Sequence, residues 1–422
     1  MPAEPRVATA PESKRFRLGW PKRWGFLLAL VGPGLMVMLA DTDVGSAITA
    51  AQSGVRWGDA MILPQLVLMP ILYFVQEMTV RLGIVTQKGH GEAIREHFGI
   101  GWGLLSVTTL FLVAVGALIT EFSGIAGVSE LLGIPVWIGV SLAALILIAI
   151  GFSGAYQRVE WIGIALGSLE VAFFVTAALA HPSGTALVHG LTTIPITQSS
   201  YLYLLAANVG AVIMPWMIFY QQGAVIDKRW SVADISKARW DTGIGAVITQ
   251  LLMIAIVMTA ASTLRAHHVT NLNSVAQISA GLTSVLGPLA GKLIWGAGIV
   301  GAGFVAALVA SVAGAWGISE VLGIPHSFNR RIKEAPGFYV IYSLAHVAGA
   351  ILVIASVDLV QLTVDVEVMN AMLLPIVLGF LLALEARALP PEFRMRGVYR
   401  GLVYVLCGVV MAFGLYTVVT VF

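Results

Sequence analysis

A long apolar stretch near the N-terminus carries two aspartates at its centre. Asp41 and Asp43 stand in the run LADTDVGSAIT. A carboxylate in such a stretch is costly, and in membrane proteins it marks an ion or substrate path. Asp, Gly and Ser form helix poorly, so the residues around Gly45 and Ser46 predict an unwound segment. Unwound backbone frees carbonyl oxygens, which with a carboxylate and a hydroxyl form an oxygen-rich cation cage.

A second apolar stretch, ANVGAVIMPWMIF, contains an internal proline. Pro215 lacks a backbone donor and predicts a helix break that frees carbonyls near Ala211. Met214 directly precedes it, and a thioether is a soft ligand that suits transition metals and not Mg²⁺ or Ca²⁺. A methionine in a membrane helix usually only fills space, but its place beside a break favours a ligand role. Asn370, in a later apolar stretch, could add a carbonyl oxygen.

Further acids lie in apolar stretches. Glu121 and Glu320 have small or polar neighbours (ITEFSG and GISEVLG) and could be proton acceptors, groups along a cation path, or packed protonated acids. Glu77 and Arg81 stand four residues apart, which predicts an ordinary ion pair on one helix face. The remaining buried acids are Glu170, Asp365 and Glu367.

The elements that position these residues are membrane-spanning helices. Of the 422 residues, 58% are hydrophobic and 11% charged, whereas a soluble domain is roughly half apolar and a quarter charged. A helix crosses the hydrocarbon with about 20 apolar residues. Eleven segments qualify, near 25–53, 60–84, 103–131, 135–153, 161–180, 201–223, 243–264, 289–321, 337–357, 361–385 and 399–421.

The distribution of basic residues predicts the orientation. With the N-terminus inside, only Arg56, Arg265 and Lys292 of the 24 Lys and Arg fall outside, as the positive-inside rule requires. We therefore expect a multi-pass protein of the plasma (inner) membrane, with a cytoplasmic N-terminus and an external C-terminus. The longest external loops are expected at 181–200 and 265–288.

The domain organisation follows from the two breaks. Residues 1–23 are polar and basic and predict a cytoplasmic tail, and 24–422 form a single transmembrane domain. The broken spans 1 and 6 lie five spans apart, and because five is odd, two such halves are inverted relative to each other. This predicts repeats at about 24–180 and 201–386, with an extra helix at about 399–421.

Other classes find no support in the sequence. It holds no P-loop, Rossmann fingerprint, nucleophile elbow or HExxH motif, so we expect no enzyme and no cofactor. A lone cysteine, Cys407, forms neither an intramolecular disulfide nor a cysteine cluster. The expected partners are a divalent metal ion and the lipid bilayer, with neither nucleic acid nor an obligate protein partner.

These motifs resemble those of the Nramp family of divalent-metal transporters, which have the LeuT-like inverted-repeat fold. The resemblance covers nearly the whole chain. The family's span 1 carries Asp-Pro-Gly-Asn, then Thr and Gln-Ala-Gly; the matching positions here are Asp43-Val44-Gly45-Ser46, Thr49 and Gln52-Ser53-Gly54. Its span 6 carries Ala, two residues, then Met-Pro-His, matched here from Ala211 to Pro215, with Trp216 in place of the histidine. The resemblance implies that Asp43, Met214 and the Ala211 carbonyl bind metal, with Ser46 a weaker ligand.

Departures from the family pattern concern proton coupling. Proton-coupled members carry two histidines in span 6, where this chain has Trp216 and Gln221, and an acidic pair in span 3, where it has Glu121 and Gly124. In these features the chain is similar to the Nramp-related magnesium transporters, an uncoupled branch that lacks the methionine. Retention of Met214 favours Mn²⁺.

The resulting expectation is alternating-access transport of a divalent metal, Mn²⁺ first and Mg²⁺ second, without proton coupling. The alternative of another class is a Na⁺- or H⁺-coupled carrier of organic solutes on the same fold. Such a carrier would direct helix N-termini at an anionic group instead of building a carboxylate-plus-thioether cluster.

Overall fold

The computed structural model describes residues 32–153, 156–274, 277–278, 287–355 and 359–421, and every regular element in them is a helix. Among these residues, nine segments are long and apolar enough to cross a bilayer. The class predicted from composition, an all-helical multi-pass membrane protein, is thereby confirmed. The predicted cytoplasmic tail, residues 1–23, lies outside the described residues.

The nine segments comprise most of the helices. They are drawn from α3 and α4 (Val44–Trp57 and Ile62–Thr86, joined by η1, Gly58–Met61), α6 (Ile100–Leu131), α8 and α9 (Tyr156–Gly167 and Val171–Leu179, joined by η2, Ser168–Glu170), α11 and α12 (Ser199–Val212 and Pro215–Asp227), α13 (Ile235–Ser262, preceded by η3, Val232–Asp234), α15 (Pro288–Leu322), α16 (Pro336–Ile354), α17 (Leu359–Arg387) and α18 (Gly397–Val421). The shorter helices are α2 (Pro33–Asp41), α5 (His90–Phe98), α7 (Val136–Gly151) and α10 (Gly184–Thr192).

Some elements differ from the expectation. Helix α13 begins at Ile235, about two turns before the predicted apolar start, because Ser231 and Asp234 form a capping box ahead of it. Helix α10 lies in the predicted external loop 181–200. Helix α5 was not predicted; its N-terminus is stabilised by a distant residue, since Glu320 accepts a hydrogen bond from Gly91 N at 2.8 Å.

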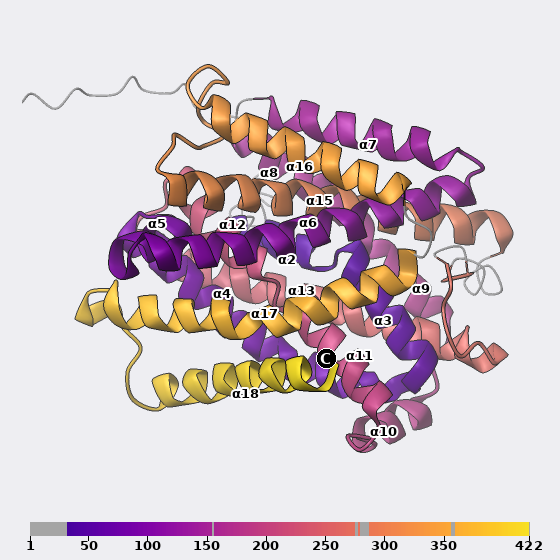
Figure 1. Ribbon diagram of the computed structural model, residues 1–422. Coiled ribbons are helices and arrows are strands. Elements are labelled where there is room, and N and C mark those ends of the chain that lie inside the picture. Colours follow the sequence, from indigo (N-terminus) through magenta and orange to yellow (C-terminus); the bar gives the residue numbers. More distant parts are fainter. Residues whose placement is uncertain (1–31, 154–155, 275–276, 279–286, 356–358, 422) are drawn as a thin grey trace, which may run out of the picture.

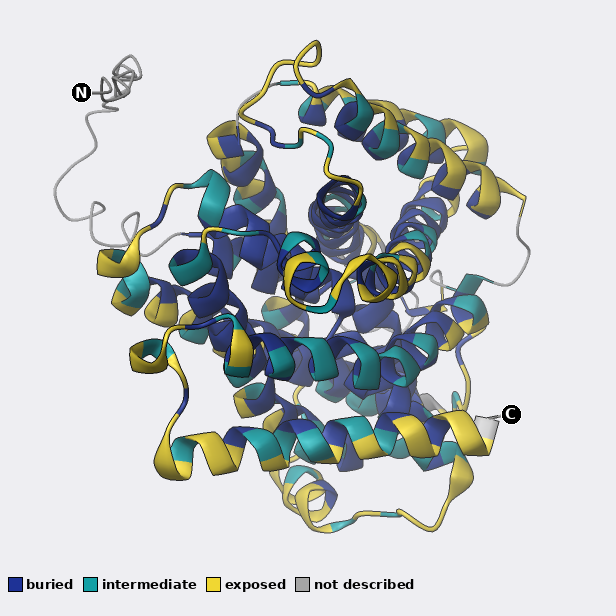
Figure 2. Ribbon diagram, turned by 60° about the vertical axis from the view of Figure 1, so that its left-hand side comes forward, coloured by how far each residue is buried: buried dark blue, intermediate teal, exposed yellow. Residues whose placement is uncertain are grey.

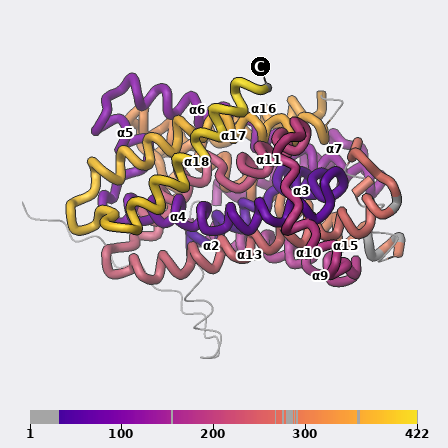
Figure 3. The backbone as a smooth tube through the Cα atoms, turned by 90° about the horizontal axis from the view of Figure 1, so that it is seen from below, coloured from indigo at the N-terminus to yellow at the C-terminus, as the bar shows by residue number. Residues whose placement is uncertain are grey.

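The long helices run along roughly one common direction (Figure 1), with α7 and α16 on one side and α18 at the opposite edge. Buried residues concentrate in the middle of the bundle (Figure 2). In the apolar stretch of the α11–α12 segment 83% of the residues are buried, against 28% in that of α18, so the former is central and the latter peripheral. Seen from below, α2, α3 and α4 lie between α13 and the α16–α18 side (Figure 3).

One ion-pair network joins four helices near the C-terminal end of α4. Arg81 contacts Glu77 at 3.1 Å, confirming the predicted pair, and also Glu385 of α17 at 3.4 Å. Arg239 of α13 contacts Glu77 at 2.8 Å, and the Tyr399 hydroxyl of α18 donates to Glu77 at 3.0 Å. Because Glu77, Arg81 and Glu385 are buried, the charges compensate one another where water cannot.

The short helix α2 is positioned by α13. The Asp241 carboxylate accepts hydrogen bonds from Gly34 N at 2.7 Å and Leu35 N at 3.0 Å. These are two of the donors that a helix leaves unpaired at its N-terminus, and a carboxylate there also complements the helix dipole. Asp241 thus fixes the start of the helix that leads to the first break.

Candidate metal-binding site

The first break separates α2 from α3. Helix α2 ends at Asp41 and α3 begins at Val44, with Asp43 as the N-cap residue. Asp43 Oδ1 accepts a hydrogen bond from Ser46 N at 2.6 Å. Its other oxygen, Oδ2, is buried and has no hydrogen-bond partner among the described residues. One oxygen of this carboxylate therefore holds the helix start, and the other is available to a ligand.

The second break separates α11 from α12. In a continuous helix the Ala211 carbonyl would accept from the N–H four residues later, but that residue is Pro215, which has none. Instead the Ser46 hydroxyl donates to the Ala211 carbonyl at 2.8 Å. This bond joins the two breaks and brings Asp43, Ser46 and Ala211 together.

Met214 lies between Ala211 and the second half of the broken helix. It is the N-cap residue of α12, with extended backbone and a fully buried side chain. The thioether is therefore withdrawn from solvent and lies one residue before the proline, as the sequence predicts.

Helix α17 contributes a carboxylate to the same region. Gly45 lies so close to Glu367 that any side chain at position 45 would clash with Glu367 Oε1. Asn370 Nδ2 donates to Glu367 Oε2 at 2.9 Å, while Asn370 Oδ1 has no partner in the described part of the chain. Glu367 is not among the ligands predicted from the sequence; its only signal is an acid one helical turn before Asn370 in an apolar stretch.

Glu121 of α6 lies at the start of α3. Its Oε2 accepts from Val44 N at 3.1 Å, and its Oε1 accepts from the Thr120 hydroxyl at 3.1 Å. A side chain at Gly124, one turn later, would clash with Val44. Val44 stands where the Nramp motif has proline, and Gly124 where proton-coupled members have an acid, so the space for that acid is occupied here by valine.

Two further acids lie beside the first break. Asp41 Oδ2 accepts from the Thr249 hydroxyl at 3.3 Å, and that hydroxyl also bonds the Thr42 hydroxyl at 2.6 Å. Glu170 is fully buried and interacts electrostatically with Asp41 and Asp43. Asp41 is thus directed towards α13, away from the Ser46–Ala211 bond.

The electrostatic character of the region follows from these placements. Five carboxyl groups surround the break, and none of them takes part in an ion pair found in the described residues; they are Asp41, Asp43, Glu121, Glu170 and Glu367. Buried carboxylates without a counter-charge cost several kcal/mol each. A bound cation would compensate them.

The donor set limits how a metal could be held. In the part of the chain that the structure describes, no three His, Cys, Asp or Glu side chains converge closely enough to hold a metal alone. The site instead offers the Asp43 carboxylate, the Ser46 hydroxyl and the Ala211 carbonyl, with Met214 and Glu367 adjacent. Oxygen ligands suit any divalent cation, and a thioether suits only a softer one.

The other predicted pathway residues lie apart from this cluster. Glu320 is engaged at the start of α5 and lies 3.8 Å from His326 Nε2. In α12, Gln221 Nε2 donates to the Thr242 hydroxyl at 2.9 Å. Trp216 is buried, and its indole nitrogen has no hydrogen-bond partner among the residues described.

Fold and site together define a polytopic helical membrane protein with two interrupted helices that meet at an acidic centre. The family model for natural resistance-associated macrophage protein-like proteins, Nramp, matches residues 34–420. The chain belongs to the Nramp family.

A sequence relative agrees with this assignment, and two solved structures share the fold. The chain is 27% identical over 387 residues to the divalent metal cation transporter MntH of Ralstonia nicotianae, covering 85% of this chain and 87% of that protein. The manganese transporter of Eremococcus coleocola has a similar structure, with a TM-score of 0.74 at 17% identity over 97% of this chain and 88% of that one. A Na⁺-coupled sialic acid symporter also has a similar structure, with a TM-score of 0.61 at 14% identity over 92% of this chain and 89% of that one.

The bond between the two breaks is testable without metal. We expect Ser46→Ala to lower the free energy of unfolding by about 1–3 kcal/mol, because the Ala211 carbonyl loses its donor. The matched control is Ser343→Ala: Ser343 donates to the Tyr339 carbonyl at 2.8 Å, which a helical N–H also serves, so we expect a change below about 0.5 kcal/mol. Denaturation in detergent at zero metal measures both. Equal losses would contradict the account of the Ala211 carbonyl.

Proposed function

We propose that this protein transports divalent metal cations by alternating access and binds its substrate between the two helix breaks. The observation that carries the proposal is the junction of Asp43, Ser46 and the Ala211 carbonyl inside a cluster of buried acids that form no ion pair with a described basic residue. The names of the relatives agree with it, since both the Ralstonia and the Eremococcus proteins are metal transporters by name.

The preferred substrate is Mn²⁺. Met214 supports this choice because a thioether favours a partly dehydrated transition metal, whereas Mg²⁺ releases water reluctantly and prefers oxygen. Mg²⁺ is the second candidate, favoured by Glu367, whose carboxylate beside Gly45 adds hard oxygen ligands. An organic-solute carrier is less well supported: the symporter neighbour shares the fold, but fold alone does not determine substrate.

The membrane arrangement belongs to the same proposal. Eleven spans result if α2 with α3 forms one, α4 the next, α7 a short one, and α8 with α9 and α11 with α12 one each. Two inverted repeats, at about 24–180 and 201–386, then place the breaks in corresponding spans, followed by the extra helix at about 399–421. The distribution of basic residues favours a cytoplasmic N-terminus and a C-terminus outside the plasma membrane.

The carboxylate is the first test. Asp43→Ala should weaken Mn²⁺ binding by more than about 100-fold, since it removes the free carboxylate oxygen at the break. Glu367→Gln should weaken it less, and Asp41→Ala least, because Asp41 is directed towards Thr249. Calorimetric titration of the purified protein with Mn²⁺ measures all three. Undiminished binding in Asp43→Ala would refute this site.

The thioether is tested by selectivity. Met214→Ala leaves oxygen ligands only, so Cd²⁺ and Mn²⁺ binding should weaken by about tenfold, or ~1.4 kcal/mol, while Mg²⁺ and Ca²⁺ binding stays constant or improves. Met217→Ala, one turn further along α12 and equally buried, is the matched control. The same Cd²⁺ affinity in Met214→Ala and in the unaltered protein would mean that Met214 only fills space.

Transport without proton coupling is the third expectation. Histidine titrates near physiological pH, and Trp216 and Gln221, in the positions where the family has histidine, do not. Glu121 is engaged by Val44 N, and Gly124 offers no acidic partner. In proteoliposomes at a clamped potential, Mn²⁺ uptake should leave a lumenal pH dye unchanged. Metal-dependent acidification that disappears in Glu121→Gln would show coupling through Glu121.

A further inference from the structure

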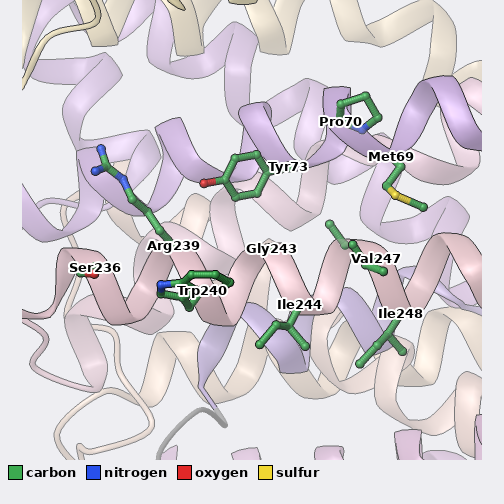
Figure 4. Close-up of a pocket in the computed structure, with 11 residues that line it drawn as sticks. Met69, Pro70, Tyr73, Ser236, Arg239, Trp240, Gly243, Ile244, Val247 and Ile248 are labelled. Atoms are coloured by element: carbon green, nitrogen blue, oxygen red, sulfur yellow. The ribbon is translucent and has the colours of Figure 1, made fainter.

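An apolar groove runs along the outer surface between α4 and α13 (Figure 4). Its cavity measures about 690 Å³. The α4 wall comes from Met69, Pro70 and Tyr73, and the α13 wall from Gly243, Val247 and Ile248. Gly243 has no side chain, so the groove stays open beside the Tyr73 ring.

The α13 wall of the groove has the length of one membrane leaflet. Its lining on α13 extends from Ser236 to Ile248, which at about 1.5 Å per residue spans ~18 Å. The hydrocarbon core is about 30 Å thick, so one leaflet is ~15 Å deep. An acyl chain of a single leaflet therefore matches the groove in both length and polarity.

One end of the groove carries polar and basic groups. Arg239 uses Nε and Nη2 to contact Glu77, while its side chain remains 48% exposed, and Ser236 is exposed one turn earlier. Trp240 is 66% exposed at the same level, where an indole suits the boundary between headgroups and hydrocarbon. This end lies on the side that the basic residues predict to be cytoplasmic.

The local charge favours an anion. Residues 228–240 contain four basic side chains, Lys228, Arg229, Lys237 and Arg239, against the single acid Asp234. Lys228 also pairs with Glu160, and Arg239 with Glu77, so the excess of positive charge comes from Arg229 and Lys237. A guanidinium binds phosphate oxygens with strong, directed hydrogen bonds. The apolar groove thus matches the acyl chain of a phospholipid, and the basic end of the groove matches the phosphate.

We propose that this groove binds one anionic phospholipid of the cytoplasmic leaflet, with an acyl chain along Gly243 and Val247 and the phosphate at Arg239 and Ser236. The opposite face of α13 contacts the first broken span: Asp241 caps α2, and Thr249 bonds Thr42. A lipid in the groove therefore packs against the helix that positions the site.

Lipid retention tests the proposal independently of transport. The purified protein is incubated with phosphatidylglycerol or phosphatidylcholine in detergent, and bound lipid is counted by native mass spectrometry. We expect one retained phosphatidylglycerol, preferred over phosphatidylcholine by about fivefold, the effect of one basic residue near an anionic surface.

Matched variants assign the binding to the groove. Gly243→Leu fills it and keeps α13 helical, since leucine is the better helix former; Val247→Phe fills it from a second position. Gly401→Leu on α18, where no atom lies within 4 Å of the added Cβ, is the control. Both filling variants should lose the retained lipid, and Gly401→Leu should keep it. Equal retention in the folded filling variants and the control would overturn the proposal.

The headgroup contact has its own pair of variants. Arg239→Gln should abolish the preference for phosphatidylglycerol, while Glu77 keeps Arg81 and Tyr399. Arg396→Gln, an exposed arginine elsewhere, should leave the preference intact. If the unaltered protein retains both lipids equally, or if Arg239→Gln retains the preference, the anionic headgroup is not recognised and the proposal fails.

Discussion

Backbone hydrogen bonding in a medium without water is the constraint on which this structure depends. Pro215 leaves the Ala211 carbonyl without its helical donor, and the start of α3 leaves donors without acceptors. The Ser46 hydroxyl satisfies the first, and Asp43 and Glu121 satisfy the second. The residues that repair the two breaks are thus the same residues that offer ligands, so the stability of the breaks and the composition of the site are coupled.

The features that could be predicted from the sequence are those that depend on the residues of one short segment. The helix breaks follow from Pro215 and from the poor helix formers Asp43, Gly45 and Ser46, whereas the grouping of Asp43, Ser46 and Ala211 came from the resemblance to the Nramp motifs. What depends on the packing of remote helices could not be predicted. The approach of Glu367 to Gly45 requires the register of α17 against α3, and the start of α13 depends on a cap outside the apolar run.

The contact between Val44 and Gly124 links two departures from the Nramp pattern. Each looks independent in the sequence, one in the first break and one in α6. In the structure the valine side chain occupies the space that any side chain at position 124 would need. Restoring an acid at position 124 alone would therefore create a clash, and the two positions are expected to change together.

The helices joined by the Glu77 network are held more firmly than α2. The Glu77 network joins α4 to α13 and α17 by ion pairs and to α18 by the Tyr399 hydrogen bond, whereas α2 is held to α13 by two backbone hydrogen bonds to Asp241 and by the Thr42–Thr249 contact. Each hydrogen bond, whether neutral or to one charged group, contributes about 1–3 kcal/mol to stability, and breaking a buried ion pair costs more. The polar contacts that hold α2 therefore cost less to break than the buried Arg81–Glu385 pair that joins α4 to α17, so a rearrangement of the first broken span can leave those two helices in place.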